Sequence, residues 1–544
     1  MISISFKRWL THPTKSITGA ATIIAATSFF SRLLGVFRDR ILASQFGAGE
    51  DLDVYYAAFR VPDLIYNLLI VGALSAGFIP VFVATRRRLI NGDKEAWHLA
   101  NAFLTVTFTG LAVVCALGAI FVYQLAPFIT PGFSPEKIFA VASLSRIMFL
   151  SPLLLGISAV VGGVLQSYRN FFVFGLAPIF YNIGIILGAI VLVPVMGLSG
   201  LAWGVVLGAT LHLAVQLPTI TKLGWSIRWA WDLKNRGLRM IGQLMIPRTL
   251  ALGVTQLNLL ILTIIASYLA SGSVAVFNLA TNLYMLPVAT IGISYALAVF
   301  PTLSEQAAVD NQKGFRDSFQ ETVRQVFFFI IPATVLFLLL RAQIVRAILG
   351  SGAFDWTDTV MTFETLRWLS YSLFAQALLP LLARAFYAYQ NTITPLLTGV
   401  LGDIITIVGG ISLMGPYGVV GLAIAFSIGS IAQVIALWLA LRWRLGNLGE
   451  SKIMAALGSF TVAGLVMAFV TQGVKTGLGQ LFGTTTFLDI ILQGGLAGLA
   501  GVISYLAVLS LWQSEELAGF LLAWHWRAAA VEVGREGLDE GEGI

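Results

Sequence analysis

The chain has 544 residues, of which 58% are hydrophobic and only 11% are charged, and its formal net charge is +7. A soluble protein carries roughly 25% charged residues and could not cover its surface with so few. The composition therefore excludes a soluble enzyme, a disordered chain and a coiled coil, and the single cysteine, Cys115, excludes a disulfide scaffold. We assign the positive charge to basic loops at a membrane and expect no nucleic-acid partner.

Membrane-spanning helices are the main elements that the sequence predicts. A helix needs about 20 mostly apolar residues to cross a bilayer. Fourteen segments meet this requirement, and the first two are the least apolar. In chain order they lie near residues 20–43, 53–83, 98–127, 138–168, 172–193, 198–221, 239–270, 274–303, 318–340, 360–389, 393–414, 418–441, 453–472 and 487–511. The predicted fold is an all-α polytopic membrane protein with about 14 transmembrane helices.

Lysine and arginine are divided unequally between the two sets of loops. With the N-terminus inside, the cytoplasmic loops and termini hold 21 of them. The outer loops hold only Lys137, Arg341, Arg346 and Lys475. Because basic residues stay on the cytoplasmic side, both termini are expected in the cytoplasm.

The sequence repeats itself at a constant offset, which relates residue 197 to residue 418. The glycine motif at 197–208 recurs at 418–429, and Tyr-x-Asn at 168–170 recurs at 389–391 with the same offset. Six spans per repeat return the chain to its starting side, so the two lobes are expected to be related by a pseudo-twofold axis along the membrane normal. The predicted domains are an N-terminal lobe at 1–222, a C-terminal lobe at 223–446, spans 13 and 14 at 447–512, and a disordered acidic cytoplasmic tail at 513–544.

Two like lobes leave a cleft between them. Transporters bind substrate in such a cleft, and rocking of the lobes opens the site to one side of the membrane and then to the other. A duplicated scaffold without transport is the alternative. The first two spans carry ionisable residues that would cost at least about 2.5–3.5 kcal/mol each if they faced lipid. The candidate substrate-binding residues in these spans are Ser31, Arg32, Arg38, Asp39, Asp53 and Arg60.

Arginine holds two phosphate oxygens at once in its planar fork, so Arg32, Arg38 and Arg60 predict a cationic chamber for an anionic substrate. Gly35 and Pro62 permit kinks that would turn these arginines to the cleft. Structural ion pairs or contacts with lipid headgroups are the alternative, which we favour for Arg40.

The remaining candidates concern coupling and catalysis. Asp403 in the eleventh predicted span is a possible ligand for a coupling cation, or it is protonated or faces water. The four histidines show no metal-ligand spacing, so we expect no metal and no cofactor, with transport coupled to the membrane potential or to a monovalent cation. Asp51 and Asp53 are similar to the acidic pair of membrane glycosyltransferases, which leaves such an enzyme as an alternative.

A family resemblance rests on the motifs of the first two spans. These are Ser31-Arg32-Leu33-Leu34-Gly35-x-x-Arg38-Asp39, Phe46-Gly47-Ala48-Gly49, Asp53, Arg60-x-Pro62 and Gly72-Ala73-x-Ser75-x-x-Phe78-x-Pro80. They resemble the N-terminal signature of the MurJ (MviN) family in the multidrug/oligosaccharidyl-lipid/polysaccharide exporter superfamily. The resemblance covers nearly the whole chain, and fourteen spans is the family's number.

The resemblance implies a flippase of the bacterial plasma (inner) membrane, not an enzyme. It would move lipid II, an undecaprenyl-diphosphate-linked peptidoglycan precursor for cell-wall biogenesis, from the inner to the outer leaflet. It also implies that Arg32, Arg38, Asp39, Asp53 and Arg60 line a central cavity, that spans 13 and 14 form a groove for the lipid tail, and that the protein works as a monomer among membrane lipids.

The sequence departs from the family pattern at two positions where an arginine is expected, which are Tyr66 and Asn282 here. A flippase for another lipid-linked oligosaccharide, such as an O-antigen or exopolysaccharide unit, is therefore the alternative. A cation-coupled drug exporter or a polytopic glycosyltransferase is a more distant one.

Overall fold

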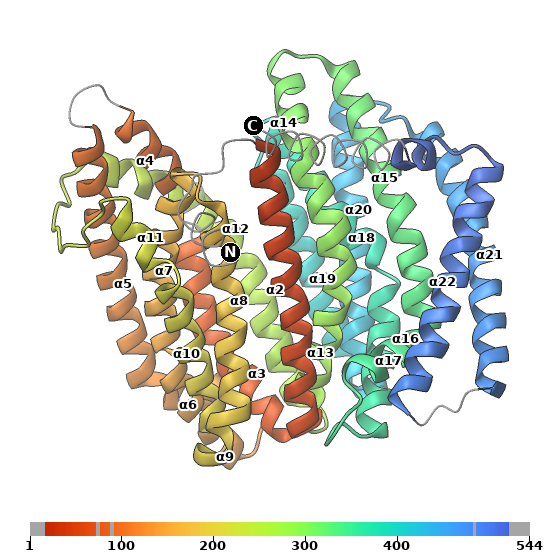
Figure 1. Cartoon of the computed structure of the whole chain (residues 1–544), viewed down its shortest axis with the longest axis horizontal. Helices are drawn as coiled ribbons and strands as arrows, with labels where there is room; N and C mark the ends of the chain where they lie inside the picture. Colours follow the sequence, from red (N-terminus) through yellow and green to blue (C-terminus); the bar gives the residue numbers. More distant parts are fainter. Residues whose placement is uncertain (1–16, 72–76, 88–91, 482–485, 522–544) are drawn as a thin grey trace, which may run out of the picture. The chain divides into compact units, whose positions relative to one another are not determined.

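The computed structural model describes residues 17–71, 77–87, 92–481 and 486–521, and this part of the chain consists of helices without any strand (Figure 1). The all-α fold predicted from composition is confirmed. The N-terminal basic residues Lys7, Arg8 and Lys15, the motif residues at 72–75 and the tail from residue 522 lie outside the described residues.

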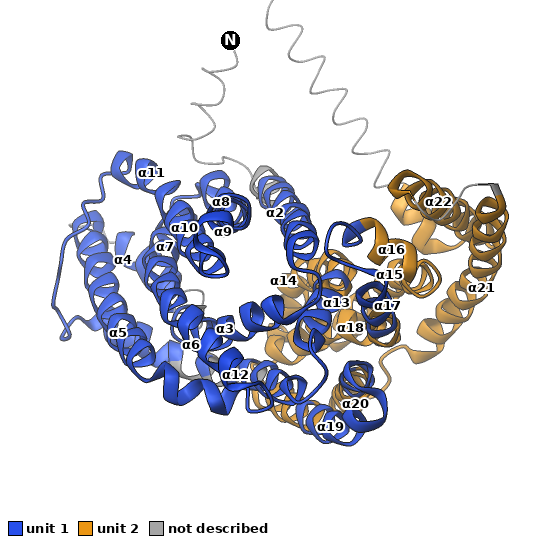
Figure 2. Ribbon diagram, turned by 90° about the horizontal axis from the view of Figure 1, so that it is seen from below, with its two compact units in different colours: residues 1–283, 348–365, 403–426 blue, residues 284–347, 366–402, 427–544 orange. Residues whose placement is uncertain are grey.

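The chain divides into two compact units, which Figure 2 shows in different colours. Unit 1 comprises residues 1–283, 348–365 and 403–426, and unit 2 comprises residues 284–347, 366–402 and 427–544. The helices in the first half of the chain are α2 (Ile17–Phe46), α3 (Glu50–Tyr66), η1 (Asn67–Val71), α4 (Ile79–Arg86), α5 (Gly92–Ile129), α6 (Pro135–Met148), α7 (Leu150–Ser167), α8 (Phe171–Leu187), η3 (Gly188–Leu192), α9 (Val193–Met196), α10 (Ser199–Ala214), α11 (Leu217–Lys222) and α12 (Arg236–Ser267).

The second half of the chain repeats this all-helical design. Its helices are α13 (Ser273–Pro287), η4 (Val288–Ile293), α14 (Ser294–Ala308), α15 (Gln312–Leu339), α16 (Arg341–Ile348), α17 (Trp356–Ser370), α18 (Leu373–Ala388), α19 (Ile393–Tyr417), α20 (Val419–Leu445), α21 (Glu450–Leu481) and α22 (Phe487–Leu511). The segments η1, η3 and η4 are π-helical.

Among the described residues, ten helices are long and apolar enough to cross a membrane, or eleven if the bent pair α17 and α18 is one span. The protein is therefore a multi-pass membrane protein. Helix α2 has 30 residues, enough to cross a bilayer, but it is not among these ten. The number fourteen stays a prediction.

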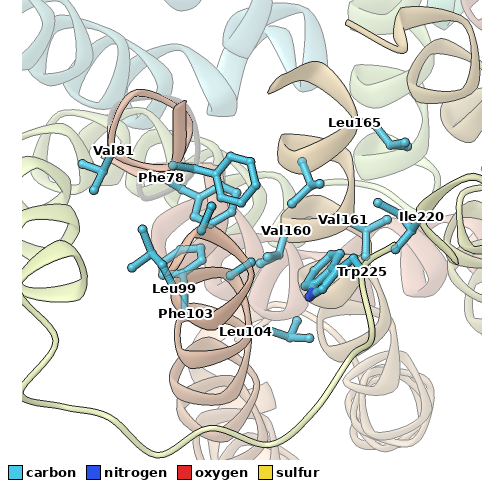
Figure 3. Close-up of a cluster of buried hydrophobic side chains, with 14 of the residues drawn as sticks. Phe78, Val81, Leu99, Phe103, Leu104, Val160, Val161, Leu165, Ile220 and Trp225 are labelled. Atoms are coloured by element: carbon cyan, nitrogen blue, oxygen red, sulfur yellow. The ribbon is translucent and has the colours of Figure 1, made fainter. Parts of the chain in front are cut away.

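Unit 1 is held together by helices that pack on α8 and α5. Helices α2 and α10 both lie on α8, and α5 packs on α6 and α7. A buried cluster fills the space between α4, α5 and α7, and Figure 3 shows Phe78, Phe103, Val161 and Trp225 within it. Burying such aromatic and branched side chains contributes about 1.5–3 kcal/mol each. This cluster therefore ties α4, α5 and α7 together.

Unit 2 contains the last two helices. Helices α21 and α22 pack on each other, and α21 also packs on α15. Phe328, Phe460, Met467 and Tyr505 form their buried core, and the Tyr505 hydroxyl donates to the Phe328 carbonyl at 3.0 Å. The predicted start of the acidic tail lies against this unit, since Arg324 pairs with Glu515 and Glu516 at 2.8 and 2.9 Å.

The sequence repeat is visible in the local backbone of both halves. Arg169 and Gln390, which occupy equivalent positions in the two repeats, both have left-handed backbones with φ of 59° and 57°. Gly197 and Gly418 share φ values of 60° and 56°, which only glycine adopts at little cost. The π-helical segments η1 and η4 start at Asn67 and Val288, which the same offset relates. Equivalent sequence motifs therefore build equivalent turns.

Candidate functional site

Arg38 lies on α2 in a hydrogen-bonded network within unit 1. Its Nε and Nη2 donate to Oδ1 of Asp39 at 3.0 and 2.8 Å. Its Nη1 donates to Oδ1 of Asn182 on α8 at 3.1 Å. Asn182 is oriented in turn, because its Nδ2 donates to the Ser31 carbonyl at 3.3 Å. A guanidinium has more N–H donors than these three bonds use, so Arg38 can still donate to a ligand.

Asp39 is buried and joins α2 to α13. Its Oδ1 accepts from Arg38, and its Oδ2 accepts from Nδ2 of Asn282 at 2.8 Å. A buried carboxylate is tolerated only when it is paired and hydrogen-bonded, and both oxygens of Asp39 meet that condition. Asn282 stands where the resembling family has an arginine, and it here satisfies Asp39 with a neutral donor.

The hydrogen-bond partners of Arg60 on α3 are neutral, although Asp63 on the same helix also interacts with its charge. Its Nε donates to Oγ1 of Thr263 on α12 at 2.7 Å, and its Nη2 donates to Oδ1 of Asn278 on α13 at 2.7 Å. Hydrogen bonds to neutral acceptors position the guanidinium without cancelling its charge. Arg60 is therefore an oriented cation held by two helices of the second repeat.

Arg32 differs from Arg38 and Arg60 in having no partner. Its side chain is exposed, and within the described residues it makes no hydrogen bond or ion pair. Ser31 contributes its main-chain carbonyl to Asn182, as described above. Of the three predicted arginines, Arg32 is therefore the one whose donors are all unused among the described residues.

The two predicted kink positions lie inside helices. Helix α2 runs without interruption from Ile17 to Phe46, through Gly35. Pro62 lies inside α3, and the helix changes to π-helical hydrogen bonding shortly after it, at Asn67. A proline removes one N–H donor from the helix, which suits a local change of hydrogen-bond register.

Asp53 binds a helix end rather than an arginine. Its Oδ2 accepts from the main-chain N–H of Gly272 at 2.6 Å, and its Oδ1 accepts from that of Ala275 at 2.8 Å. These N–H groups belong to the first turn of α13, where helices leave donors unsatisfied and carry partial positive charge. Asp53 is 1% exposed and caps α13 from another helix.

Neighbouring contacts reinforce this end of unit 1. Lys137 Nζ pairs with Glu50 at 2.6 Å and lies 3.3 Å from the Ser271 hydroxyl. Gly272 has φ of +89°, and a Cβ there would collide with the Ala48 carbonyl. We name residues 48–53 together with 267–275 the latch. The latch joins the first two helices to the turn between α12 and α13.

Asp403 on α19 is bonded to α12. The Nδ2 of Asn258 donates to its Oδ1 at 2.6 Å. The Oδ1 of Asn258 is buried without a hydrogen-bond partner. Carboxylate and amide oxygens are hard ligands that suit Na⁺ or a similar cation better than a transition metal. No group of three or more His, Cys, Asp or Glu side chains in the described residues could hold a metal ion.

Sequence reasoning did not find the polar partners of the arginines. Asn182, Thr263 and Asn278 orient Arg38 and Arg60, yet they were not among the predicted site residues. A signal was present, because an asparagine within an apolar span usually bonds across helices. Their pairing with particular arginines needed the packing of α8, α12 and α13 around α2 and α3.

The comparison with known proteins gives the family. The family model described as "Lipid II flippase MurJ" matches residues 42–493. The chain belongs to the MurJ family of lipid II flippases. A "Probable lipid II flippase MurJ" from Vibrio cholerae is 29% identical over 512 residues, covering 91% of this chain and 96% of that protein. The "Lipid II flippase MurJ" of Burkholderia cenocepacia is 27% identical over 433 residues, covering 78% and 84%.

Solved structures agree on the fold. "Lipid II flippase MurJ, inward closed conformation" has a TM-score of 0.74 at 23% identity and covers 90% of this chain and 98% of that one. An inward-facing multidrug resistance MATE family transporter of the MOP superfamily has a TM-score of 0.64 at 16% identity, covering 77% and 96%. The family that the motifs of the first two spans predicted is confirmed by the family model, and these structures show a shared fold.

Proposed function

We propose that this protein flips lipid II from the inner to the outer leaflet of a bacterial plasma membrane by alternating access. The match of the MurJ family model to residues 42–493 carries the proposal. The arrangement of arginines in unit 1 supports it, because an undecaprenyl diphosphate presents an anionic head to the protein.

In this mechanism the diphosphate is bound first by Arg32, whose guanidinium is unpaired among the described residues. Arg60 adds an oriented charge that its neutral partners Thr263 and Asn278 do not cancel. Arg38 then binds with its remaining donors, or exchanges the Asp39 carboxylate for phosphate oxygens. Asp39 keeps its bond from Asn282 during such an exchange, so it is not left without a partner.

Transport to the outer leaflet requires the latch to open. Asp53 must leave the N–H groups of Gly272 and Ala275, which are charge-assisted bonds worth about 1.5–3 kcal/mol each. A membrane potential that is negative inside favours outward movement of an anion by about 2.3 kcal/mol per charge per 100 mV. Two negative charges on a diphosphate would gain about 4.6 kcal/mol per 100 mV, which is comparable with the ~3–6 kcal/mol of the two Asp53 bonds, so we propose that the potential drives the opening without ATP.

A monovalent cation at Asp403 is the proposed alternative source of coupling. Asp403 and the unpartnered Oδ1 of Asn258 supply oxygen ligands from α19 and α12, both within unit 1. Binding there would tie two helices of the second repeat together. If Na⁺ is the coupling ion, Asp403→Asn should remove any dependence of flipping on Na⁺ in proteoliposomes, whereas a purely potential-driven protein would show none in either form.

The wider assignments follow from the same proposal. Both termini are cytoplasmic, the protein works as a monomer, and α21 and α22 offer the lipid tail a groove. The lobes at 1–222 and 223–446 are the rocking bodies. A flippase for another lipid-linked oligosaccharide is the second candidate, because Tyr66 and Asn282 remove two cationic contacts that the family pattern leads one to expect.

The test is rescue of a bacterium depleted of its own lipid II flippase, with every lipid-linked precursor measured. The wild-type protein should restore growth and clear lipid II from the inner leaflet. Arg32→Ala, Arg38→Ala and Arg60→Ala should fail at normal membrane levels, and Lys313→Ala, an exposed cation at the start of α15, should rescue. Failure of the wild type, together with a different precursor stalled in the native host, would favour the second candidate.

A further inference from the structure

The segment that joins α11 to α12 is neither helical nor loosely attached. Residues 225–233 run along α5 in an extended path, which Figure 1 shows as the trace beside α5. We name residues 225–233 the strap. It connects the first six predicted spans to the rest of the chain, and nothing in the proposed flipping mechanism uses it.

The strap begins at a buried anchor. Trp225 is 2% exposed, packs in the cluster of Figure 3 and stacks on Trp97 with ring centroids 5.8 Å apart. Its Nε1 donates to Oδ1 of Asn101 at 3.0 Å, and Nδ2 of Asn101 donates to the Ser226 carbonyl at 3.1 Å. These contacts fix the first residues of the strap to α5.

Alternate residues then bond to α5. The main-chain N–H of Arg228 donates to Oδ1 of Asn101 at 3.1 Å, and that of Ala230 donates to Oγ1 of Thr105 at 3.0 Å. Asp232 pairs with His98 at 3.0 Å. This pattern of every second residue is that of an extended strand, and it fixes the strap on one face of α5.

The residues that alternate with these are apolar and exposed, although Trp229 also contacts α5. Ile227, Trp229, Trp231 and Leu233 are 46%, 67%, 64% and 61% exposed. Two exposed tryptophans two residues apart are unusual for a water-facing loop but typical of the membrane–water interface.

The position along α5 agrees with an interfacial depth. The Trp229 ring meets Phe108 edge-on at 5.5 Å between centroids. From Phe108 to the end of α5 at Ile129 the helix rises by about 31 Å, close to the thickness of the hydrocarbon core. The charged residues Asp93, Lys94 and Glu95 lie at the other end of α5. The strap therefore crosses α5 where the apolar part of that helix begins.

Main-chain N–H groups of the strap without hydrogen-bond partners limit how deep in the membrane the strap can lie. Within the described residues, the main-chain N–H groups of Ile227, Trp229 and Trp231 have no hydrogen-bond partner. Such groups are costly in hydrocarbon and need water or phosphate oxygens. Arg228 lies within the strap, and four more basic residues flank it in the sequence: Lys222, Lys234, Arg236 and Arg239. The one acidic residue of the strap, Asp232, is engaged with His98.

We propose that the strap is a binding site for anionic phospholipid headgroups, with Trp229 and Trp231 inserted at the base of the headgroup layer and Arg228 beside the phosphate. Unpartnered N–H groups and the Arg228 guanidinium supply donors for the phosphate oxygens, and the indole rings lie along the upper acyl chains. The site depends on the protein being in a membrane and does not depend on which substrate it flips.

Depth is tested with the full-length protein in vesicles of phosphatidylcholine and phosphatidylglycerol. With the buried Cys115 replaced by alanine, a fluorescent label is placed at Trp231→Cys and, as a control, at Ile120→Cys in the middle of the apolar part of α5. Lipids brominated near the headgroup should quench the first label most, and lipids brominated deep in the chain should quench the second. Quenching of the Trp231→Cys label by aqueous iodide alone would overturn the proposal.

Lipid choice is tested by native mass spectrometry of the purified protein titrated with phosphatidylglycerol. Arg228→Gln should weaken binding of the tightest phosphatidylglycerol adduct about fivefold, as expected for one cation at a charged headgroup. Lys313→Gln removes an exposed cation from a different turn and should leave that adduct unchanged. Equal effects of the two variants would show general charge attraction rather than a site, and no effect of either would contradict the proposal.

Discussion

Asparagine side chains hold the charged residues Arg38 and Asp39 of α2 in place. Asn182 accepts from Arg38, and Asn282 donates to Asp39, so one ion pair is held from two sides by neutral groups. An arginine at position 282 would instead bring a second cation to Asp39. Because Asn282 is neutral, this chain has one positive charge fewer near Asp39 than the family pattern predicts. The contacts of Arg38 with Asp39 and Asn182 remain.

We predict that Asn282→Arg is tolerated and Asn282→Asp is not. The arginine restores the family's residue and pairs with Asp39, which releases Arg38 for the substrate. The aspartate places two carboxylates together in a buried site, where like charges repel and one must be protonated. Rescue of the depleted strain and the rate of lipid II flipping in proteoliposomes measure the difference. Equal activity of the two variants would show that Asn282 does not act through Asp39.

The predicted arginines had different outcomes in the structure. The sequence indicated Arg32, Arg38 and Arg60 because each charge lies inside a span, but it could not say which would be paired. Only the packing of α8 against α2 places Asn182 within reach of Arg38. Arg32, one to two turns earlier on the same helix, reaches no described partner.

Helix α13 begins at a turn that another helix completes. Its first N–H groups are satisfied by Asp53 of α3, and the glycine before it has a left-handed backbone that brings it against Ala48. A cap supplied by a distant helix ties the start of α13 to α3. Opening of the latch therefore costs both hydrogen bonds and the favourable charge at the helix N-terminus.

We predict that Asp53→Asn loosens the latch, because the amide loses the charge and one of the two acceptor oxygens. A cysteine placed at the buried Ser267, in the protein lacking Cys115, should react with a membrane-impermeant maleimide about tenfold faster in this variant. Asp51→Asn is the matched control, since Asp51 is exposed and lies nearby on the same helix. Unchanged labelling in Asp53→Asn would mean that Asp53 does not hold the turn closed. Loss of flipping in Asp51→Asn would instead point to a role for the acidic pair.

Apolarity alone does not identify every helix that is long enough to cross the membrane. Helix α2 is a continuous 30-residue helix that carries three arginines, and it is not among the spans found by length and apolarity in the described residues. The π-helical segments η1 and η4 also could not be predicted from apolar periodicity. Their occurrence at equivalent positions of the two halves shows that the repeat includes details of hydrogen-bond register.

Topology is a property of the whole chain. The lysine and arginine asymmetry predicts that both termini and the strap lie in the cytoplasm, or at the cytoplasmic face of the membrane. Green fluorescent protein fused after Ile544 should fluoresce, and alkaline phosphatase fused between α21 and α22 should be active. If the first fusion did not fluoresce and the second had no phosphatase activity, the orientation would be the opposite one. The latch would then lie on the cytoplasmic side.

The sequence alone determined that the protein is a helical membrane protein, and it predicted that the chain is built from a duplication. This follows because apolar length, charge depletion and a repeated turn motif are local properties that need no partner. It also selected the charged residues of the first two helices, since a charge within a span is costly wherever the helix packs.

The tertiary structure decided what each of these charges contacts. Asp39 and Asp53 look alike in the sequence, but one joins an arginine to an asparagine and the other caps a helix that belongs to the second repeat. The strap is a similar case, because only its attachment to α5 shows that its tryptophans are exposed. Contacts between residues far apart in the sequence depend on how the helices pack against each other. The apolar periodicity of a single helix does not determine that packing.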